Sequence, residues 1–216
     1  MRRAALVVIA AAALASFAGS TGCALTTKSD LVAIRYFTPE QATPRLTAAA
    51  IESDGNRASR PLLLGRVTSG ANLRERIAFR NAAHEIGYYE DLRWTERPET
   101  YVRRELGRTL FEERGFERST AENAPELDVE VLAFDELRLP HGARAARVEL
   151  KVLLWDGPDV VVEETFTVDR PVAVREPRIE DFVSAMAAAL DDAATQVATR
   201  GATALAARGA RAPTRR

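Results

Sequence analysis

Cysteine is the rarest residue type in this 216-residue chain, with only Cys23, and histidine is among the next rarest, with His84 and His141. A single cysteine excludes a disulfide framework within the chain. The sequence contains no C-x-x-C, H-E-x-x-H or glycine-rich phosphate-binding motif. Its net charge of −1 provides no positive field that would attract nucleic acid. We therefore predict no metal site, no cofactor and no nucleic-acid partner.

The chain also has little that could cross a bilayer. Residues Ala4 to Ala18, apolar apart from Ser16, would form a helix about 22 Å long, because a helix rises about 1.5 Å per residue. A hydrocarbon core is about 30 Å thick. A basic head, here Met1-Arg2-Arg3, before a short apolar run and small residues is typical of a secretory signal peptide. We predict a cleaved signal peptide over residues 1–22; the alternative is an uncleaved N-terminal anchor.

The end of this segment accounts for the one thiol. Ser20-Thr21-Gly22-Cys23 resembles the lipobox of bacterial lipoproteins, with serine at the position where leucine is usual. The resemblance implies that Cys23 is lipidated and becomes the first residue of the mature chain. Because Ala24 and not aspartate follows it, the resemblance also implies anchoring to the outer membrane, on its periplasmic face. The alternative is an ordinary signal peptide with a free Cys23.

The rest of the chain has an ordinary globular composition, 46% hydrophobic and 28% charged. We expect a lipidated tether over residues 23–30 and one compact domain over residues 31–200. Residues 201–216 are rich in alanine and arginine, and we predict a disordered basic tail there.

Hydrophobic periodicity predicts the elements of that domain. Spacing by three and four residues indicates two main helices, one from near Arg97 to Gly115 and one from Ile179 to near Gly201. Alternation and turn residues indicate strands at 31–37, 61–67, 76–80, 86–94, 127–131, 146–154 and 160–168. Short links predict a hairpin from the third and fourth strands and an antiparallel meander from the last three. The expected fold class is α/β (α+β), with a mixed or antiparallel sheet and two helices packed on it.

Several of these segments resemble one family. The stretches that show the resemblance are Ile34–Thr38, Leu63–Val67, IGYYEDLRWTERPETYVRREL from Ile86, and LLWDGPDVVVEETFTVDRPV from Leu153, followed by the last predicted helix. Together they resemble the ABC-type transport auxiliary lipoproteins, which include the lipoprotein of the paraquat-inducible system. The resemblance extends over about Leu31 to Arg200, with departures at 48–60 and 72–76.

The resemblance implies a function without catalysis. Proteins of this kind are periplasmic lipoproteins that accompany ABC transporters and the MCE-domain proteins that carry lipids between membranes. It therefore implies a membrane partner through the lipid anchor, and a protein partner that is an MCE-domain protein or an ABC permease or substrate-binding component. A homo-oligomer is compatible with this assignment. The alternative is a structural lipoprotein of another envelope assembly, in secretion or lipopolysaccharide assembly.

Tyr88, Tyr89 and Trp94 are the residues that we expect near a partner surface, because aromatic side chains with a polar tip suit partly hydrated interfaces. The alternative is that alternate rings pack into the core and support the following helix. An envelope hydrolase that uses His84 or His141 is a third hypothesis. Histidines in separate predicted turns are usually solvated, so this hypothesis has the least support from the sequence.

Overall fold

The computed structural model of the chain describes residues 32–40, 60–82, 84–172 and 178–211. The predicted signal peptide over 1–22, Cys23 and the tether lie outside the described residues. Among the described residues, those from Ile34 onward belong to one compact unit.

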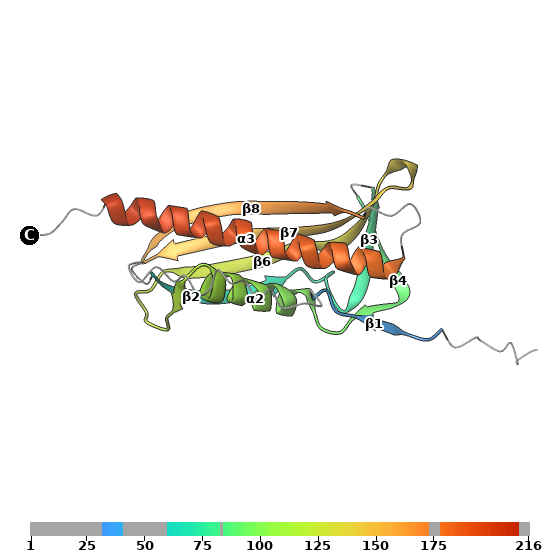
Figure 1. Cartoon of the computed structure of the whole chain (residues 1–216), viewed down its shortest axis with the longest axis horizontal. Coiled ribbons are helices and arrows are strands. Elements are labelled where there is room, and N and C mark those ends of the chain that lie inside the picture. The colour runs from blue at the N-terminus through green and yellow to red at the C-terminus, as the bar shows by residue number, and fades with distance from the viewer. Residues whose placement is uncertain (1–31, 41–59, 83, 173–177, 212–216) are drawn as a thin grey trace, which may run out of the picture. The chain divides into compact units, whose positions relative to one another are not determined.

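The sheet is organised around one long strand, β6 (Glu126–Arg138), shown in Figure 1. β7 (Arg144–Asp156) pairs antiparallel along the whole of one edge of β6. The other edge is divided between two parallel strands, β2 (Arg60–Ser69) along the first half and β3 (Arg76–Ala82) along the second. The sheet is therefore forked at the middle of β6.

The other strands extend the sheet from these four. β8 (Asp159–Pro171) pairs antiparallel with β7, and β4 (Glu85–Trp94) pairs antiparallel with β3. Two short strands, β1 (Arg35–Phe37) and β5 (Phe116–Arg118), lie parallel to β4 and β2. In the described residues eight strands thus form one mixed sheet. The predicted β3–β4 hairpin and β6–β7–β8 meander are confirmed, whereas no sequence pattern predicts β5.

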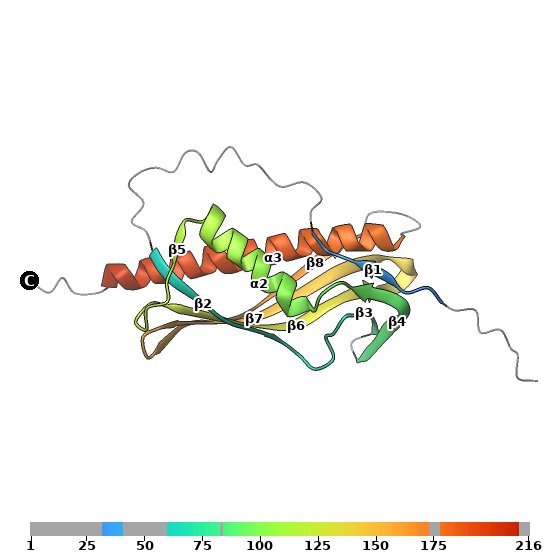
Figure 2. The same ribbon diagram turned by 90° about the horizontal axis from the view of Figure 1, so that it is seen from below.

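Both helices lie on the same side of this sheet, as Figure 2 shows. α2 (Pro98–Arg108) continues into a π-helical turn, η2 (Thr109–Glu113), and α3 (Ile179–Arg211) packs on β7 and β8. A short 3₁₀ turn, η3 (Pro140–Gly142), connects β6 to β7. The expected fold class, a mixed sheet with two main helices packed on it, is confirmed.

The bounds of α2 follow from local chemistry. Pro98 occupies the first helical turn, where its missing N–H breaks no helical hydrogen bond. Glu99 lies at the positive end of the helix dipole. After η2, Gly115 adopts φ = +70°, a left-handed conformation that glycine takes without a steric penalty. Glycine at this position ends the helical segment.

An aromatic cluster forms the centre of the core beneath the helices. The Trp94 ring lies 5.4 Å from that of Phe134 on β6, 6.0 Å from that of Phe182 on α3 and 6.4 Å from that of Tyr101 on α2. All four side chains are at most 2% exposed. Buried residues of β6 and β7, including Val129, Val131, Val148, Leu150 and Val152, continue this core along the sheet.

The predicted end of the last helix near Gly201 is wrong, because α3 continues to Arg211. Residues 202–211, which we expected to be disordered, are helical; residues 212–216 lie outside the described part. Beyond Gly201, Leu205 packs against the core, and Arg208 forms ion pairs with Asp156 and Asp159 at the β7–β8 turn. The C-terminal part of α3 thus packs against the end of the sheet that carries the β7–β8 turn.

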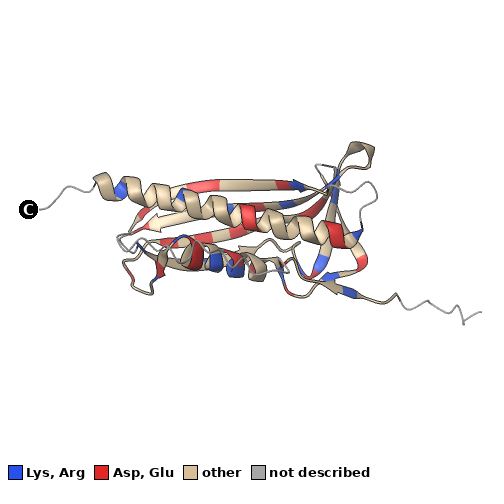
Figure 3. Ribbon diagram, in the orientation of Figure 1, with Lys and Arg blue, Asp and Glu red and all other residues tan. Residues whose placement is uncertain are grey.

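Charges are sparse along α3 and denser on α2 in Figure 3. Even so, no helix in the described ranges combines the length and the hydrophobicity that a membrane crossing would need.

Replacing the ring at the centre of the core tests this packing. We expect Trp94→Ala to lower the free energy of unfolding by about 3–5 kcal/mol, since it removes an aromatic side chain that three others contact. Trp155→Ala on β7, where the side chain is only half-buried, is the matched control and should lose far less. Urea unfolding of both variants measures this, and equal losses would contradict the assignment.

Candidate functional site

Trp94 does not lie on a surface. With 1% of its area exposed, it is enclosed by Tyr101, Phe134 and Phe182. The burial corrects the expectation that Trp94 contacts a partner, and it agrees with the alternative in which this ring supports the following helix. Trp94 is the last residue of β4, where it pairs with Phe37 of β1. Its ring faces Phe182 of α3, so the helix covers it.

Tyr89 faces the same side of the sheet as the helices and is half-buried there. Its hydroxyl donates a 2.6 Å hydrogen bond to Glu136, which is fully buried and also paired with Arg138 and Arg144. The Arg138 guanidinium lies over the rings of Phe79 and Tyr89. Burial raises the pKa of the Tyr89 hydroxyl, and the hydrogen bond to Glu136 adds to that rise. These contacts explain Tyr89 as part of an internal polar cluster.

Tyr88 points to the opposite side, which carries no helix. It pairs with Ala78 of β3, and its hydroxyl donates to the backbone carbonyl of Asn72 at 3.0 Å. The guanidinium of Arg76 lies 5.3 Å from the centre of the Tyr88 ring. Of the three aromatic residues singled out in the sequence, Tyr88 is therefore the one in a position to meet a partner.

Tyr88 has neighbours that the sequence did not reveal. Arg76 pairs with Arg93 of β4, and Arg93 pairs with Tyr36 of β1. Ile34, the residue before β1, is exposed beside this strand. We call these five residues, Ile34, Tyr36, Arg76, Tyr88 and Arg93, the tyrosine–arginine patch. Only the pairing of β1, β4 and β3 brings them together, since they are scattered over 60 positions of the sequence.

The part of the helix-free side formed by β6 and β7 has a different character. It carries an excess of carboxylates, on Glu126, Asp128, Glu130 and Glu149, which we call the acidic band. Two bases lie among them: Arg66 is exposed on β2, and Lys151 is paired with Glu163 at 3.5 Å.

Two apolar side chains and a glycine complete the acidic band. Leu153 and Trp155 are half-buried on this side of β7. A Cβ atom at Gly65 of β2 would lie 2.4 Å from a Glu126 carboxylate oxygen and 2.6 Å from one of Asp128. Glycine is therefore required here for the β6 carboxylates to lie across β2.

A row of charges crosses four strands on the same side. Arg80 of β3 pairs with Asp135 of β6 at 2.9 Å, and Arg147 of β7 forms two 2.7 Å hydrogen bonds with Asp169 of β8. Asp135 is 1% exposed, and one of its oxygens has no hydrogen-bond partner among the described residues. Burial raises the pKa of Asp135 above its ordinary value, although the nearby Arg80 opposes the rise.

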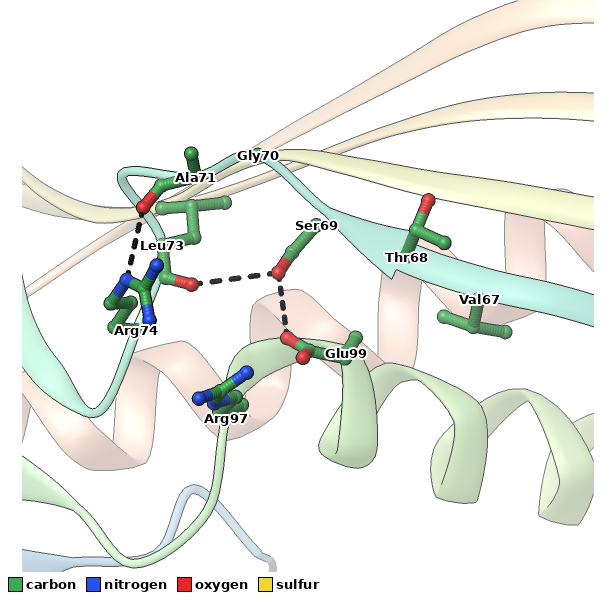
Figure 4. Close-up of a pocket in the computed structure, with 9 residues that line it drawn as sticks. All are labelled: Val67, Thr68, Ser69, Gly70, Ala71, Leu73, Arg74, Arg97 and Glu99. Atoms are coloured by element: carbon green, nitrogen blue, oxygen red, sulfur yellow. Dashed lines mark hydrogen bonds between the residues drawn. The ribbon is translucent and has the colours of Figure 1, made fainter.

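A pocket of about 300 Å³ lies where the sheet forks, between the β2–β3 loop and the start of α2. Figure 4 shows that Ser69 donates a 2.7 Å hydrogen bond to Glu99, with Arg74 and Arg97 at the rim. Arg97 is paired with Glu75 at 2.8 Å. The residues that line this pocket include no histidine. The Ser69 hydroxyl therefore has no imidazole base beside it in the pocket, as a typical hydrolase nucleophile would.

Neither histidine is buried. His84 is exposed between β3 and β4, and His141 is exposed in η3, where it adopts φ = +64°. In the part of the chain that the structure describes, no group of three or more histidine, cysteine or acidic side chains could hold a metal ion.

Comparison with known families decides the assignment. The model of the ABC-type transport auxiliary lipoprotein component matches residues 45–198, well over half of the chain. The chain belongs to this family. Membership places the auxiliary lipoprotein in the cell envelope and associates it with an ABC-type transport system. The match covers nearly all of β2 to α3, which includes the acidic band and three of the five residues of the patch.

Solved structures agree on the fold. A protein from Xanthomonas campestris superposes with a TM-score of 0.64 at 19% identity, over 82% of this chain and 98% of that protein. A second, described only as uncharacterized, superposes with a TM-score of 0.52 at 15% identity, over 65% of this chain and 90% of its own. At these identities the likeness concerns the fold alone. No curated protein matches the auxiliary lipoprotein.

The buried Asp135 predicts how stability depends on pH. A carboxyl whose pKa is raised on folding binds its proton more readily in the folded protein, so stability falls as pH rises through the interval between its ordinary value, near 3.8, and the raised value. Relative to Asp135→Asn, the wild-type protein should therefore gain stability as the pH is lowered from neutral into that interval.

Urea unfolding of both proteins at a series of pH values measures the difference. Glu112→Gln, at an exposed site after α2, is the matched control and should change the pH dependence less than Asp135→Asn does. A wild-type protein that loses stability relative to Asp135→Asn on acidification would contradict the assignment.

Proposed function

We propose that this auxiliary lipoprotein is a non-catalytic, lipid-anchored component of an MCE-type ABC transport system that moves lipids or lipophilic solutes across the envelope. Its place is the periplasmic face of the outer membrane. The family description, an auxiliary component, supports a role in assembly over a role in catalysis. The Cys23 lipid would hold the domain at the membrane while another surface contacts the transporter.

The observation that carries this proposal is the acidic band on a sheet face that no described helix covers. A sheet face turned to water is usually polar throughout. This face also carries two large apolar side chains, Leu153 and Trp155, which are half-buried among its carboxylates. A partly apolar centre with a charged rim is the usual composition of a protein interface. Since the charges are mostly negative, the complementary partner surface is basic.

Anchoring makes a modest contact sufficient. A domain attached to the membrane meets a membrane-bound partner at a much higher local concentration than it would in free solution. A small, charged interface can therefore remain occupied without the large hydrophobic area of an obligate complex. The acidic band has this character, because only two of its central side chains are large and apolar.

The experiment is crosslinking and affinity purification of the tagged auxiliary lipoprotein from native membranes. The wild-type protein should recover an MCE-domain protein or an ABC permease. The double variant Glu130→Lys with Glu149→Lys should recover several-fold less of that protein, because two attractive charges become repulsive. Raising the salt concentration should weaken recovery by the wild type as well, since exposed charges are screened.

The control double variant reverses Glu112 and Glu122, two exposed carboxylates outside the sheet. It carries the same change in net charge, so its recovery should equal that of the wild type. Equal losses from both double variants would contradict docking through the acidic band. Recovery of a secretion or lipopolysaccharide-assembly component instead would support the alternative function.

A further inference from the structure

The start of the described chain exposes more apolar area than a soluble surface usually does in so few residues. Val32, Ile34 and Tyr36 are 64%, 52% and 63% exposed. They alternate with Arg35 and the half-buried Phe37, which packs against the core. Phe37 therefore fixes β1 on the domain and turns Ile34 and Tyr36 outward, away from the helices. Their exposure follows from the pairing of β1 with β4.

Arginines continue this surface across the sheet. Tyr36 pairs with Arg93, Arg93 pairs with Arg76, and the Arg76 guanidinium covers the ring of Tyr88. The row thus places two guanidinium groups between two phenol rings, beside an exposed aliphatic side chain. Tyrosines are enriched where protein meets the headgroup layer of a membrane, because their rings are apolar and their tips polar. Arginine supplies a fork of N–H donors that matches a phosphate group.

Acidic side chains also lie near the patch. Glu75 is paired with Arg97, 2.8 Å away. Glu90 and Asp91 lie in the irregular part of β4, between the pairs of Arg76 with Arg93 and of Ala78 with Tyr88. The Arg76–Arg93 pair borders that irregular part, and Nη1 of Arg93 donates to the backbone carbonyls of Tyr89 and Leu92.

The length of the tether sets the distance to the bilayer. Eight residues separate Cys23 from Val32, and the nine residue steps between these two positions span at most about 30 Å when fully extended. The patch adjoins β1, the first strand after this tether. The tether therefore limits how far β1, where the patch begins, can lie from the lipid anchor, whereas β8 is at the far edge of the sheet from β1.

We propose that the tyrosine–arginine patch lies against the surface of the anchoring bilayer, with Arg76 and Arg93 contacting anionic phospholipid headgroups and with Ile34 and Tyr36 in the interfacial layer. The inference rests on one part of the proposed function, the lipid at Cys23. It does not depend on the identity of the transporter. Contact of this kind would orient the domain on the membrane and leave the acidic band free for a protein partner.

The test uses the lipidated mature protein on vesicles of phosphatidylethanolamine and phosphatidylglycerol. Because lipid occupies the sulfur of Cys23, Tyr36→Cys supplies a single thiol for an environment-sensitive fluorophore. Thr165→Cys, exposed on β8 on the same side of the sheet, is the matched control. Brominated phospholipid should quench the label at position 36 several-fold more than the label at position 165. Adding Arg76→Glu should reduce that quenching without changing flotation of the protein with the vesicles.

The outcomes separate this inference from the proposed function. Flotation with equal quenching at positions 36 and 165 would overturn the patch assignment and leave the transporter role intact. Absence of flotation, with an unmodified Cys23 by mass spectrometry, would overturn the anchor and the patch assignment together. A photocrosslinker at position 36 that captures a protein in native membranes, and no lipid, would assign the patch to that protein instead. Strong quenching with no transporter recovered would support the patch and contradict the proposed function.

Discussion

The fold depends on the pairing of β6, because this strand alone joins the two halves of the sheet. Its last pair with β2 is at Val131 and its first pair with β3 is at Asp135, while β7 follows it without interruption along the other edge. A shift in the β6–β7 register between Val131 and Ala133 coincides with this change of partner. An irregularity of this kind increases the local twist of a sheet, so the β3–β4 hairpin departs in a different direction from β2.

The position of both helices follows from the same sheet. Most of the apolar side chains of β6, β7 and β8 face one side, and α2 and α3 bury them there. The other side then keeps its charges, some of which pair across the strands. The result is a domain with one structural face and one face available for contacts, which suits an auxiliary component of a transport system. Its two regions differ in sign, since arginines lie near β1 and carboxylates lie on β6 and β7.

Burial of polar groups sets a limit on how this second face can change. Asp135 and Glu136 are adjacent in β6 and point to opposite sides, and each is buried beside arginine. A buried charge without its partner is strongly unfavourable. Replacing Asp135 or Glu136 would consequently destabilise the fold. Exposed residues such as Glu130 and Tyr36 can be replaced without this loss of stability.

The sequence by itself determined the elements that have a clear period: the alternating strands of the meander, the hairpin of β3 and β4, and the two helices. It also pointed to Tyr88 and to the family. Tertiary structure decided which aromatic residues are accessible. Tyr88 and Trp94 are an even number of residues apart, yet they face opposite sides, because the register of β4 shifts between its pairs with Arg76 and Ala78. The helical state of 202–211 was equally invisible, since contacts of Leu205 and Arg208 with the sheet override the glycine at 201. The patch of Ile34, Tyr36, Arg76, Tyr88 and Arg93 exists only through strand pairing, which no local pattern specifies.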